Sequence, residues 1–292
     1  MPLEKVVFIS CAGHSGSTLL NLILGSHSGI FGLGELRSFR KHYPNLCGVC
    51  GSACPFWNTR PIVPLLGSYF RRGRGARRLL GAAVRRHRSI YRYLARSAGV
   101  HILVDSSKDV RWYRRQLRFT RHWRRVEPIL VYLVRDGRAV VNSVLRKYPE
   151  RSISSVTERW IEDKKERDRL WTDFPGARYR LRYEELALHP NIETRKLCAF
   201  IDVPFEPDMI HFWKFDHHLI GYRIISLCMV LISCTLTLIS LYLAVLPSRN
   251  STIIFAYIIF LSGILYYSVI QPIVSYNTES LLSLSFLLLF TT

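Results

Sequence analysis

The segment that most constrains the fold is ISCAGHSGSTLLNLILGSH, residues 9–27. It passes from a short apolar run through small residues into an apolar stretch with helical character. A strand, a tight loop and a helix in that order direct backbone N–H groups and the positive helix end at an anion. Proteins that bind nucleoside triphosphates this way carry a Gly-Lys pair in the loop, whereas Ser17 follows Gly16 here. The loop therefore predicts an anion site of a different kind, with a plain tight turn as the alternative.

The remainder of the first 223 residues alternates between two kinds of segment. Predicted strands, rich in β-branched residues, lie at 5–10, 101–107, 128–135 and 179–186. Predicted helices lie at 17–26, 76–96, 109–125, 137–147 and 153–171. This alternation favours an α/β fold with a central parallel sheet covered on both faces. Ligands of such sheets bind outside the carboxyl ends of the strands, so the polar residues that end these strands are the candidate site residues.

Charge divides the chain into two parts. The formal net charge is +20, yet residues 224–292 contain only one basic and one acidic residue, Arg249 and Glu279. The other 40 basic and 20 acidic residues all lie in 1–223. The basic part favours anionic partners such as nucleotides, nucleic acid, acidic glycans or lipid headgroups, although a merely solvated basic surface remains the alternative. We therefore expect a domain at 1–221 and an apolar tail at 222–292.

The apolar tail predicts membrane helices. Residues 224–246 are 23 residues without a charge, and a spanning helix needs about 20. A second apolar run follows at 253–274, and a third, at 281–290, is short for a span. A buried pair of core helices is the alternative, but neither long run has a polar face for water to contact. The sequence thus predicts two, or with the third run three, transmembrane helices after the α/β domain, with membrane contact through 224–274.

The expected location follows from the flanking residues. Arg223 precedes the first predicted span, and positive residues remain on the cytosolic side. The N-terminus MPLEKVVFIS lacks the long apolar run of a signal peptide. The seven cysteines, an odd number without a secretory signal, argue against a disulfide framework. We expect a membrane protein whose N-terminal domain faces the cytosol.

A second motif, LVYLVRDGRAVVNSVLRK, ends a predicted strand with Arg135 and carries Ser143 on the following helix. Together with the loop AGHSGSTLL, it resembles the sulfotransferase family, whose members use 3′-phosphoadenosine 5′-phosphosulfate (PAPS). The resemblance implies a P-loop-like three-layer fold and sulfonyl transfer to a hydroxyl acceptor: a carbohydrate, a tyrosine or a small molecule. It implies that Arg135 and Ser143 bind the 3′-phosphate and that no metal is required. The residues implied to hold the 5′-phosphosulfate are Gly13, His14, Ser15, Gly16, Ser17 and Thr18.

The other site residues come from three further segments. The Gly-Glu of FGLGELRSFRK is similar to that of the bacterial-type and tyrosylprotein-sulfotransferase-like branch, where the glutamate takes the acceptor proton, so Glu35 is the expected general base. Lys108 in LVDSSKDVR would neutralise charge on the transferring group, with Ser106 or Ser107 orienting it. Tyr183 in YRLRYEELALHP would flank adenine. A helix-start acid, a surface lysine and a core tyrosine are the respective alternatives.

Three cysteines, Cys47, Cys50 and Cys54, lie in NLCGVCGSACPFW. A C-x₂-C pair plus a third cysteine allows a zinc site, with His42 as a possible fourth ligand. Structural zinc needs four ligands, and the sequence contains no second C-x₂-C pair. We therefore treat the three cysteines as weak metal candidates and favour a thiol-lined structural loop.

The resemblance covers residues 5 to about 221. The family usually continues with a segment that closes over the 3′-phosphate, whereas this chain continues with YRIISLCMVLISC. The alternative function is therefore a catalytically impaired, membrane-anchored protein that keeps the fold and binds only nucleotide or a partner. A nucleic-acid-binding module is disfavoured because the sequence does not clearly interleave aromatic and basic residues on strands.

Overall fold

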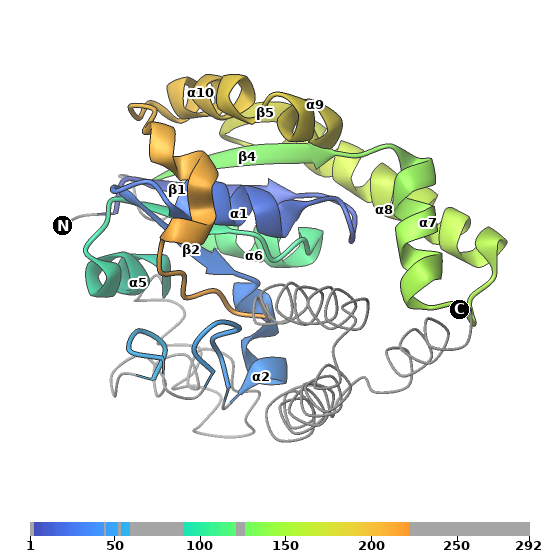
Figure 1. Ribbon diagram of the computed structural model, residues 1–292, viewed down its shortest axis with the longest axis horizontal. Coiled ribbons are helices and arrows are strands. Elements are labelled where there is room, and N and C mark those ends of the chain that lie inside the picture. Colours follow the sequence, from blue (N-terminus) through green and yellow to red (C-terminus); the bar gives the residue numbers. More distant parts are fainter. Residues whose placement is uncertain (1–2, 44, 52–53, 59–89, 121–125, 222–292) are drawn as a thin grey trace, which may run out of the picture. The chain divides into compact units, whose positions relative to one another are not determined.

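The computed structural model of the protein describes residues 3–43, 45–51, 54–58, 90–120 and 126–221 (Figure 1). These residues belong to the first of two units into which the chain divides, Met1–Arg223. The predicted membrane segments 224–246, 253–274 and 281–290 lie outside the described residues. Within the described part of the chain, no helix is both long and apolar enough to cross a membrane.

A parallel sheet forms the centre of the described fold, in the strand order β2-β3-β1-β4-β5. Its strands are β1 (Lys5–Ser10), β2 (Ile30–Gly34), β3 (Ile102–Asp105), β4 (Glu127–Val134) and β5 (Ala177–Arg182). Every neighbouring pair is parallel, which confirms the predicted central parallel sheet. All five carboxyl ends therefore lie at one edge of the sheet.

Helices connect the strands. The described α-helices are α1 (Ser17–Gly25), α2 (Phe39–His42), α5 (Ile90–Ala98), α6 (Val110–Thr120), α7 (Gly137–Lys147), α8 (Ile153–Asp173), α9 (Tyr183–Leu188) and α10 (Pro190–Ile201). Two 3-10 helices, η1 (Leu36–Ser38) and η2 (Pro207–Lys214), complete the elements of the described residues.

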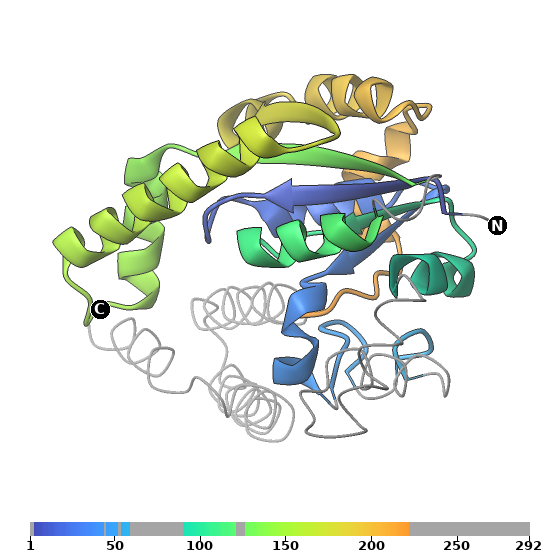
Figure 2. The ribbon, with the colours of Figure 1, turned by 180° about the vertical axis from the view of Figure 1, so that it is seen from behind.

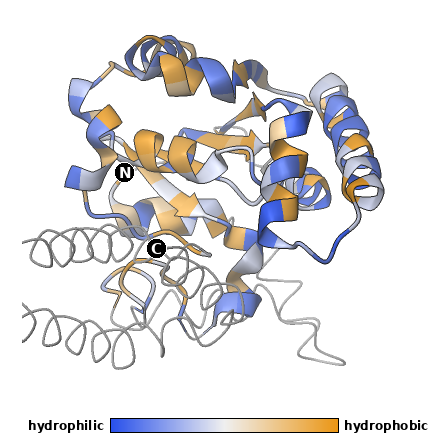
Figure 3. Ribbon diagram, turned by 45° about the vertical axis from the view of Figure 1, so that its right-hand side comes forward, coloured by the Kyte–Doolittle hydropathy of each residue, from blue (hydrophilic) through white to orange (hydrophobic). Residues whose placement is uncertain are grey.

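The two faces of the sheet carry separate apolar cores, because side chains alternate along a strand. Val6 and Phe8 of β1 are fully buried in one core, with residues of α5, α6 and α8. Val7 and Ile9 are fully buried in the other, with residues of α1, α10 and η2. Figures 1 and 2 show α1 and α6 on opposite sides of β1, and in Figure 3 the hydrophobic colour gathers in the central sheet and the helices packed on it. The sheet and its two helical layers give a three-layer α/β fold.

The prediction of a strand at 179–186 is wrong for its second half, residues 183–186, which are helical. β5 ends at Arg182, and the chain turns directly into α9. Glu184 and Glu185 occupy the first turn of that helix, where the positive end of the helix dipole stabilises negative charge. Their preference for a helix start outweighs the apolar residues that resembled a continuing strand.

Other differences concern elements that were not predicted from the sequence. The strand β2 was not predicted, since its sequence IFGLG contains two glycines, which weaken strand propensity. The helices α10 and η2 were not predicted either. Parts of two predicted helices, 76–89 and 121–125, lie outside the described residues, whereas their remainders form α5 and α6.

Candidate functional site

Each strand of the sheet is followed by a residue that the sequence analysis selected. Gly13–Thr18 follow β1, Glu35 follows β2, Lys108 follows β3, Arg135 follows β4 and Tyr183 follows β5. Because the sheet is parallel, these five strand ends meet at one edge. The fold thus brings five segments that are distant in sequence to a common site.

The loop after β1 turns at Gly16, where φ is +87°. A Cβ at this position would clash with Cδ2 and Cε2 of Tyr183, so the loop needs glycine both for its conformation and for the close approach of the ring. The helix α1 begins at Ser17, and its first helical hydrogen bond runs from Leu20 N to Gly16 O at 3.1 Å. The earlier N–H groups of the helix therefore have no intrahelical acceptor and suit an anion.

His14 connects this loop to two other elements. Its carbonyl accepts a hydrogen bond from Arg135 Nη1 at 2.6 Å, and its Nδ1 lies 3.1 Å from Ser143 Oγ on α7. Its backbone is left-handed, with φ of +63°, which is uncommon for a residue other than glycine and costs backbone strain. The contacts with Arg135 and Ser143 hold the loop in this conformation.

Arg135 contacts the aromatic ring that follows β5. Its guanidinium carbon lies 4.5 Å from the centroid of the Tyr183 ring, a cation–π contact. Its Nε is buried and has no hydrogen-bond partner among the described residues. At the start of the loop, a Cβ on Gly13 would meet nothing within 4 Å. A buried guanidinium donor and open space beside a loop of small residues fit a bound phosphate group.

Glu35 and Lys108 form an ion pair across the ends of β2 and β3. Lys108 Nζ lies 2.7 Å from Glu35 Oε1, and Ser38 Oγ donates to Glu35 Oε2 at 3.3 Å. Lys108 also has a left-handed backbone, with φ of +60°. Its N–H donates to Tyr113 Oη at 2.7 Å, so the strained residue is held from both its backbone and its side chain.

A buried carboxylate supports the segment that carries Lys108. Asp105 is fully buried at the end of β3. Its Oδ2 accepts hydrogen bonds from Tyr91 Oη at 2.6 Å and from Trp112 Nε1 at 2.9 Å, and its Oδ1 accepts one from Ser107 N at 2.8 Å. Burial raises the pKa of Asp105, whereas the hydrogen bonds from Ser107, Tyr91 and Trp112 act in the opposite direction. Sequence reasoning missed this residue, although an acid ending a buried strand was a usable signal.

The two serines that were expected to orient the transferred group are buried and bonded within the protein. Ser107 Oγ donates to Asp105 and accepts from Arg37 N at 3.0 Å. Ser106 Oγ accepts from Asn21 Nδ2 at 3.2 Å. These contacts give both serines a supporting role, in which they fix the turn before Lys108.

The groups of the site share one electrostatic environment. Burial lowers the pKa of His14, and the positive charges of Lys147, Lys108 and Arg135 lower it further. The imidazole is therefore neutral at physiological pH in the ligand-free protein. Three cations that act on one imidazole make this edge of the sheet electropositive, as an anion site requires.

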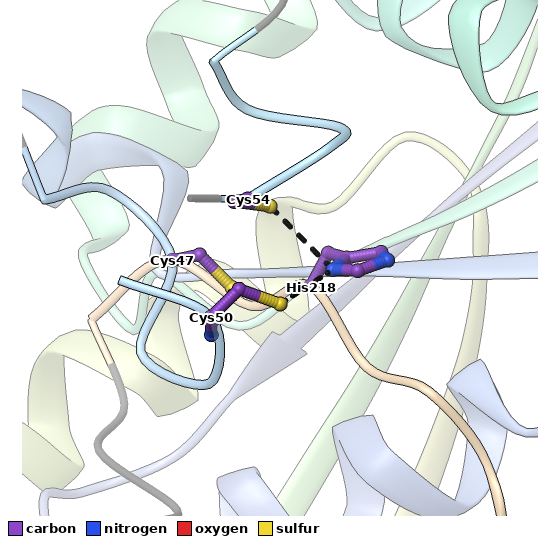
Figure 4. Close-up of side chains that lie close together, drawn as sticks. All are labelled: Cys47, Cys50, Cys54 and His218. Atoms are coloured by element: carbon purple, nitrogen blue, oxygen red, sulfur yellow. Dashed lines mark hydrogen bonds between the residues drawn. The ribbon is translucent and has the colours of Figure 1, made fainter. Parts of the chain in front are cut away.

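The cysteines lie in a different group. Cys47, Cys50 and Cys54 converge on His218 rather than on His42, and their ligand atoms all lie within 4.8 Å of one another (Figure 4). The sequence analysis named His42 as a possible fourth ligand, whereas the fourth member of the group in the structure, His218, comes from a segment distant in sequence.

Comparison with protein families gives one match. The model of the sulfotransferase family matches residues 6–207, which is more than half of the chain. No curated protein matches the sequence significantly.

Several solved structures match the chain, among them the following three. The sulfotransferase domain from the curacin biosynthetic pathway is 22% identical, with a TM-score of 0.53, over 74% of this chain and 79% of that chain. The sulfotransferase domain from the Synechococcus PCC 7002 olefin synthase is 22% identical, with a TM-score of 0.48 and the same two coverages. Retinol dehydratase in complex with androsterone and inactive cofactor PAP is 15% identical, with a TM-score of 0.34, over 70% of this chain and 62% of that chain. The first of these likenesses shows the fold.

Proposed function

The chain belongs to the sulfotransferase family, and we propose that it transfers a sulfonyl group from PAPS to a hydroxyl acceptor by in-line displacement. The observation that carries this proposal is the convergence of five segments at the carboxyl edge of the sheet. A loop suited to an anion, a half-buried arginine and a carboxylate–lysine pair meet there. Together they supply what sulfonyl transfer needs: phosphate binding, a proton acceptor and a positive charge at the reacting group.

The nucleotide half of the site consists of the loop and its partners. Gly13–Thr18 would hold the 5′-phosphosulfate with backbone N–H groups and hydroxyls. Arg135 and Ser143, which both contact His14, would bind the 3′-phosphate, because a guanidinium makes forked, charge-assisted hydrogen bonds to phosphate. Tyr183, which packs on Gly16, would flank the adenine.

The chemical half consists of the ion pair. Glu35 accepts the proton of the acceptor hydroxyl while the hydroxyl oxygen forms a bond to sulfur. The bond between sulfur and the bridging oxygen breaks, and adenosine 3′,5′-bisphosphate (PAP) leaves with that oxygen. Lys108, within hydrogen-bond distance of Glu35, stabilises the negative charge that spreads over the sulfonyl oxygens. We propose as acceptor the hydroxyl of a carbohydrate, a tyrosine or a small molecule. We also propose that the chain belongs to the bacterial-type or tyrosylprotein-sulfotransferase-like branch of the family.

Calorimetric titration of the full-length protein with PAP tests the nucleotide site. We expect micromolar binding that Arg135→Ala weakens at least tenfold. Arg138→Ala is the matched control, because Arg138 lies three residues away with its side chain 92% exposed and paired to Asp136. Equal affinities of the two variants would refute the role of Arg135.

Transfer of labelled sulfate from PAPS to a panel of sugars, tyrosine peptides and small alcohols then tests the reaction. Binding of PAP without transfer to any acceptor would favour the alternative, a membrane-anchored protein that binds nucleotide without catalysis. Absence of PAP binding by the folded protein would refute the transfer proposal and would leave, of the alternative, only a membrane-anchored protein that keeps the fold and binds a partner.

The membrane prediction is part of the same proposal: residues 224–274 attach the domain 1–221 to a membrane, with the domain in the cytosol. The uncharged length of 224–246 supports it. Extraction of isolated membranes at alkaline pH and protease protection of the N-terminal domain test it. Release of the full-length protein into the alkaline supernatant would contradict it.

A further inference from the structure

Three thiols and one imidazole meet at a point that the proposed transfer reaction does not use. Cys47, Cys50 and Cys54 belong to the segment after α2, and His218 lies more than 160 residues later, just before the end of the described chain. Figure 4 shows all four side chains directed toward a common centre. Cys47 and Cys54 are buried, and Cys50 and His218 are partly buried.

The spacing of the ligand atoms matches a tetrahedral metal site. With Zn–S bonds of about 2.3 Å and Zn–N bonds of about 2.0–2.1 Å, tetrahedral angles place sulfur about 3.6 Å from nitrogen. The observed distances from His218 Nδ1 are 3.3 Å to Cys50 Sγ and 3.5 Å to Cys54 Sγ. The same bond lengths separate two sulfurs by about 3.8 Å, within the 4.8 Å that bounds the whole group. From this geometry we propose that Cys47, Cys50, Cys54 and His218 bind a structural zinc ion.

The backbone around the cysteines is arranged as for metal-bound thiolates. Cys50 N donates to Cys47 Sγ at 3.3 Å, and Trp57 N donates to Cys54 Sγ at 3.4 Å. Gly51, directly after the second cysteine, is left-handed with φ of +62° and closes the turn through a bridge to Cys47. Hydrogen bonds to ligand atoms orient them and stabilise the negative charge of a thiolate. Two of the three sulfurs, those of Cys47 and Cys54, therefore already have a backbone donor that orients them.

A disulfide explains the group less well. Two cysteines could form one, but the third thiol and the imidazole would then have no role at the same point. The five cysteines of the described residues are all free thiols. Three thiolates and one neutral imidazole form the Cys₃His set typical of structural zinc, which is closed to solvent ligands.

The zinc ion would join the cysteine loop to the last described segment. Trp57 Nε1 donates to His218 O at 2.5 Å, and Gly48 N donates to Leu219 O at 2.8 Å. An isolated bridge also pairs Cys47 with Ile220. The segment lies outside any regular element, so a zinc ion bound by His218 and the three cysteines would add a direct link between it and the cysteine loop.

The same segment supports Glu35. Ile220 N donates to Leu33 O at 3.0 Å, and Glu35 N donates to Ile220 O at 2.9 Å. The zinc site would thus hold the short stretch of chain against which the end of β2 is bonded. Its role is structural, and it acts on Glu35 through position alone.

Metal analysis of the purified full-length protein tests the inference, and its outcome does not depend on transferase activity. We expect inductively coupled plasma mass spectrometry to find one zinc ion per chain. After replacement by Co²⁺, we expect the intense visible bands of a tetrahedral cobalt ion and a thiolate-to-cobalt charge-transfer band. Cys50→Ser and His218→Ala should each lose the metal, or bind cobalt with weaker or shifted charge-transfer bands.

Two controls separate this site from other thiols. Cys198→Ser changes a buried cysteine in the opposite core, and Cys228→Ser/Cys234→Ser removes the two cysteines of the apolar tail; all should retain one zinc per chain. If a ligand variant fails to fold, removal of zinc from the wild-type protein by a chelator should lower its melting temperature, and zinc should restore it. Three results would overturn the proposal: folded wild-type protein that neither contains nor takes up zinc, zinc lost equally from control and ligand variants, or a disulfide among the three cysteines.

Discussion

Lys108 Nζ lies 2.7 Å from Glu35 Oε1, although the two residues follow different strands. Their side chains are 20% and 23% exposed, so both are partly withdrawn from water without being sealed from it. A group that can accept a proton and a group that can stabilise negative charge are therefore held within one hydrogen bond of each other. A hydroxyl that enters the site could donate a hydrogen bond to the Glu35 carboxylate in place of the one from Lys108.

Glu35→Gln separates binding from catalysis. The amide keeps the size of the side chain and can still accept from Lys108, but it cannot take the acceptor proton. We expect the PAP affinity to change by less than about threefold and the transfer rate to fall roughly 10²–10⁴-fold, the range of general-base catalysis. Calorimetry and transfer of labelled sulfate measure the two effects.

Lys196→Ala is the control for this variant, because it breaks an exposed ion pair of the same 2.7 Å length on α10. That protein should transfer sulfate at the wild-type rate. A Glu35→Gln protein that is as active as Lys196→Ala would exclude Glu35 as the general base.

Two glycines of the same loop should respond differently to alanine. At Gly16, the left-handed backbone and the Tyr183 ring, which occupies the space of a methyl group, both oppose a side chain. We expect Gly16→Ala to cost about 1–3 kcal/mol of unfolding free energy. A methyl group on Gly13 meets nothing within 4 Å, so Gly13→Ala should change stability by less than about 0.5 kcal/mol. Thermal unfolding measures both, and equal losses would contradict the close packing of Tyr183 on Gly16.

Asp105→Asn should destabilise the protein more than its small change in shape indicates. Two donors, Tyr91 Oη and Trp112 Nε1, point at Asp105 Oδ2, and an amide can present an acceptor to them only by turning its NH₂ toward Ser107 N. One buried donor group is then unpaired, which costs about 1–3 kcal/mol. Tyr91→Phe, which removes a single donor, should cost less. Denaturant unfolding ranks the two, and the reverse order would contradict the proposed network.

Local sequence patterns were sufficient to predict most of the candidate residues that lie at the carboxyl edge of the sheet. The strand-loop-helix pattern predicted the Gly13–Thr18 loop, and Arg135 was found because it directly ends an apolar run. A parallel sheet places every such strand end at the same edge. Glu35 was found through the resemblance of its surroundings to a family motif, although the strand before it, β2, was not recognised.

The contacts between distant segments could not be predicted. The pairing of Glu35 with Lys108 depends on β2 lying beside β3. The order of strands in a sheet cannot be predicted from the local spacing of apolar residues. His218 could not be joined to Cys47, Cys50 and Cys54, because its position depends on the chain returning to the end of β2 after η2. Residues that act through tertiary position were therefore missed, and residues that end local elements were found.

His14 should make PAP binding depend on pH. In the ligand-free protein, burial and the charges of Lys147, Lys108 and Arg135 lower its pKa below 6.5. Bound phosphates add negative charge and raise that pKa, so the complex takes up a proton that the free protein does not hold. The affinity conferred by His14 therefore increases as the pH falls through the pKa of the complex, and it levels off below the pKa of the free protein.

His14→Asn isolates this effect, since asparagine tolerates the left-handed backbone and does not titrate. Protonation of the ligand's own phosphate, at about pH 6, weakens binding to both proteins, so the informative quantity is the ratio of wild-type to variant affinity. We expect this ratio to rise as the pH falls from about 8 to about 5.5, across the range where an imidazole titrates. Calorimetry in buffers of different ionisation enthalpy should also detect proton uptake by the wild type beyond that of His14→Asn. A constant ratio would mean that His14 holds the loop through its backbone and Ser143 alone and stays neutral beside the nucleotide.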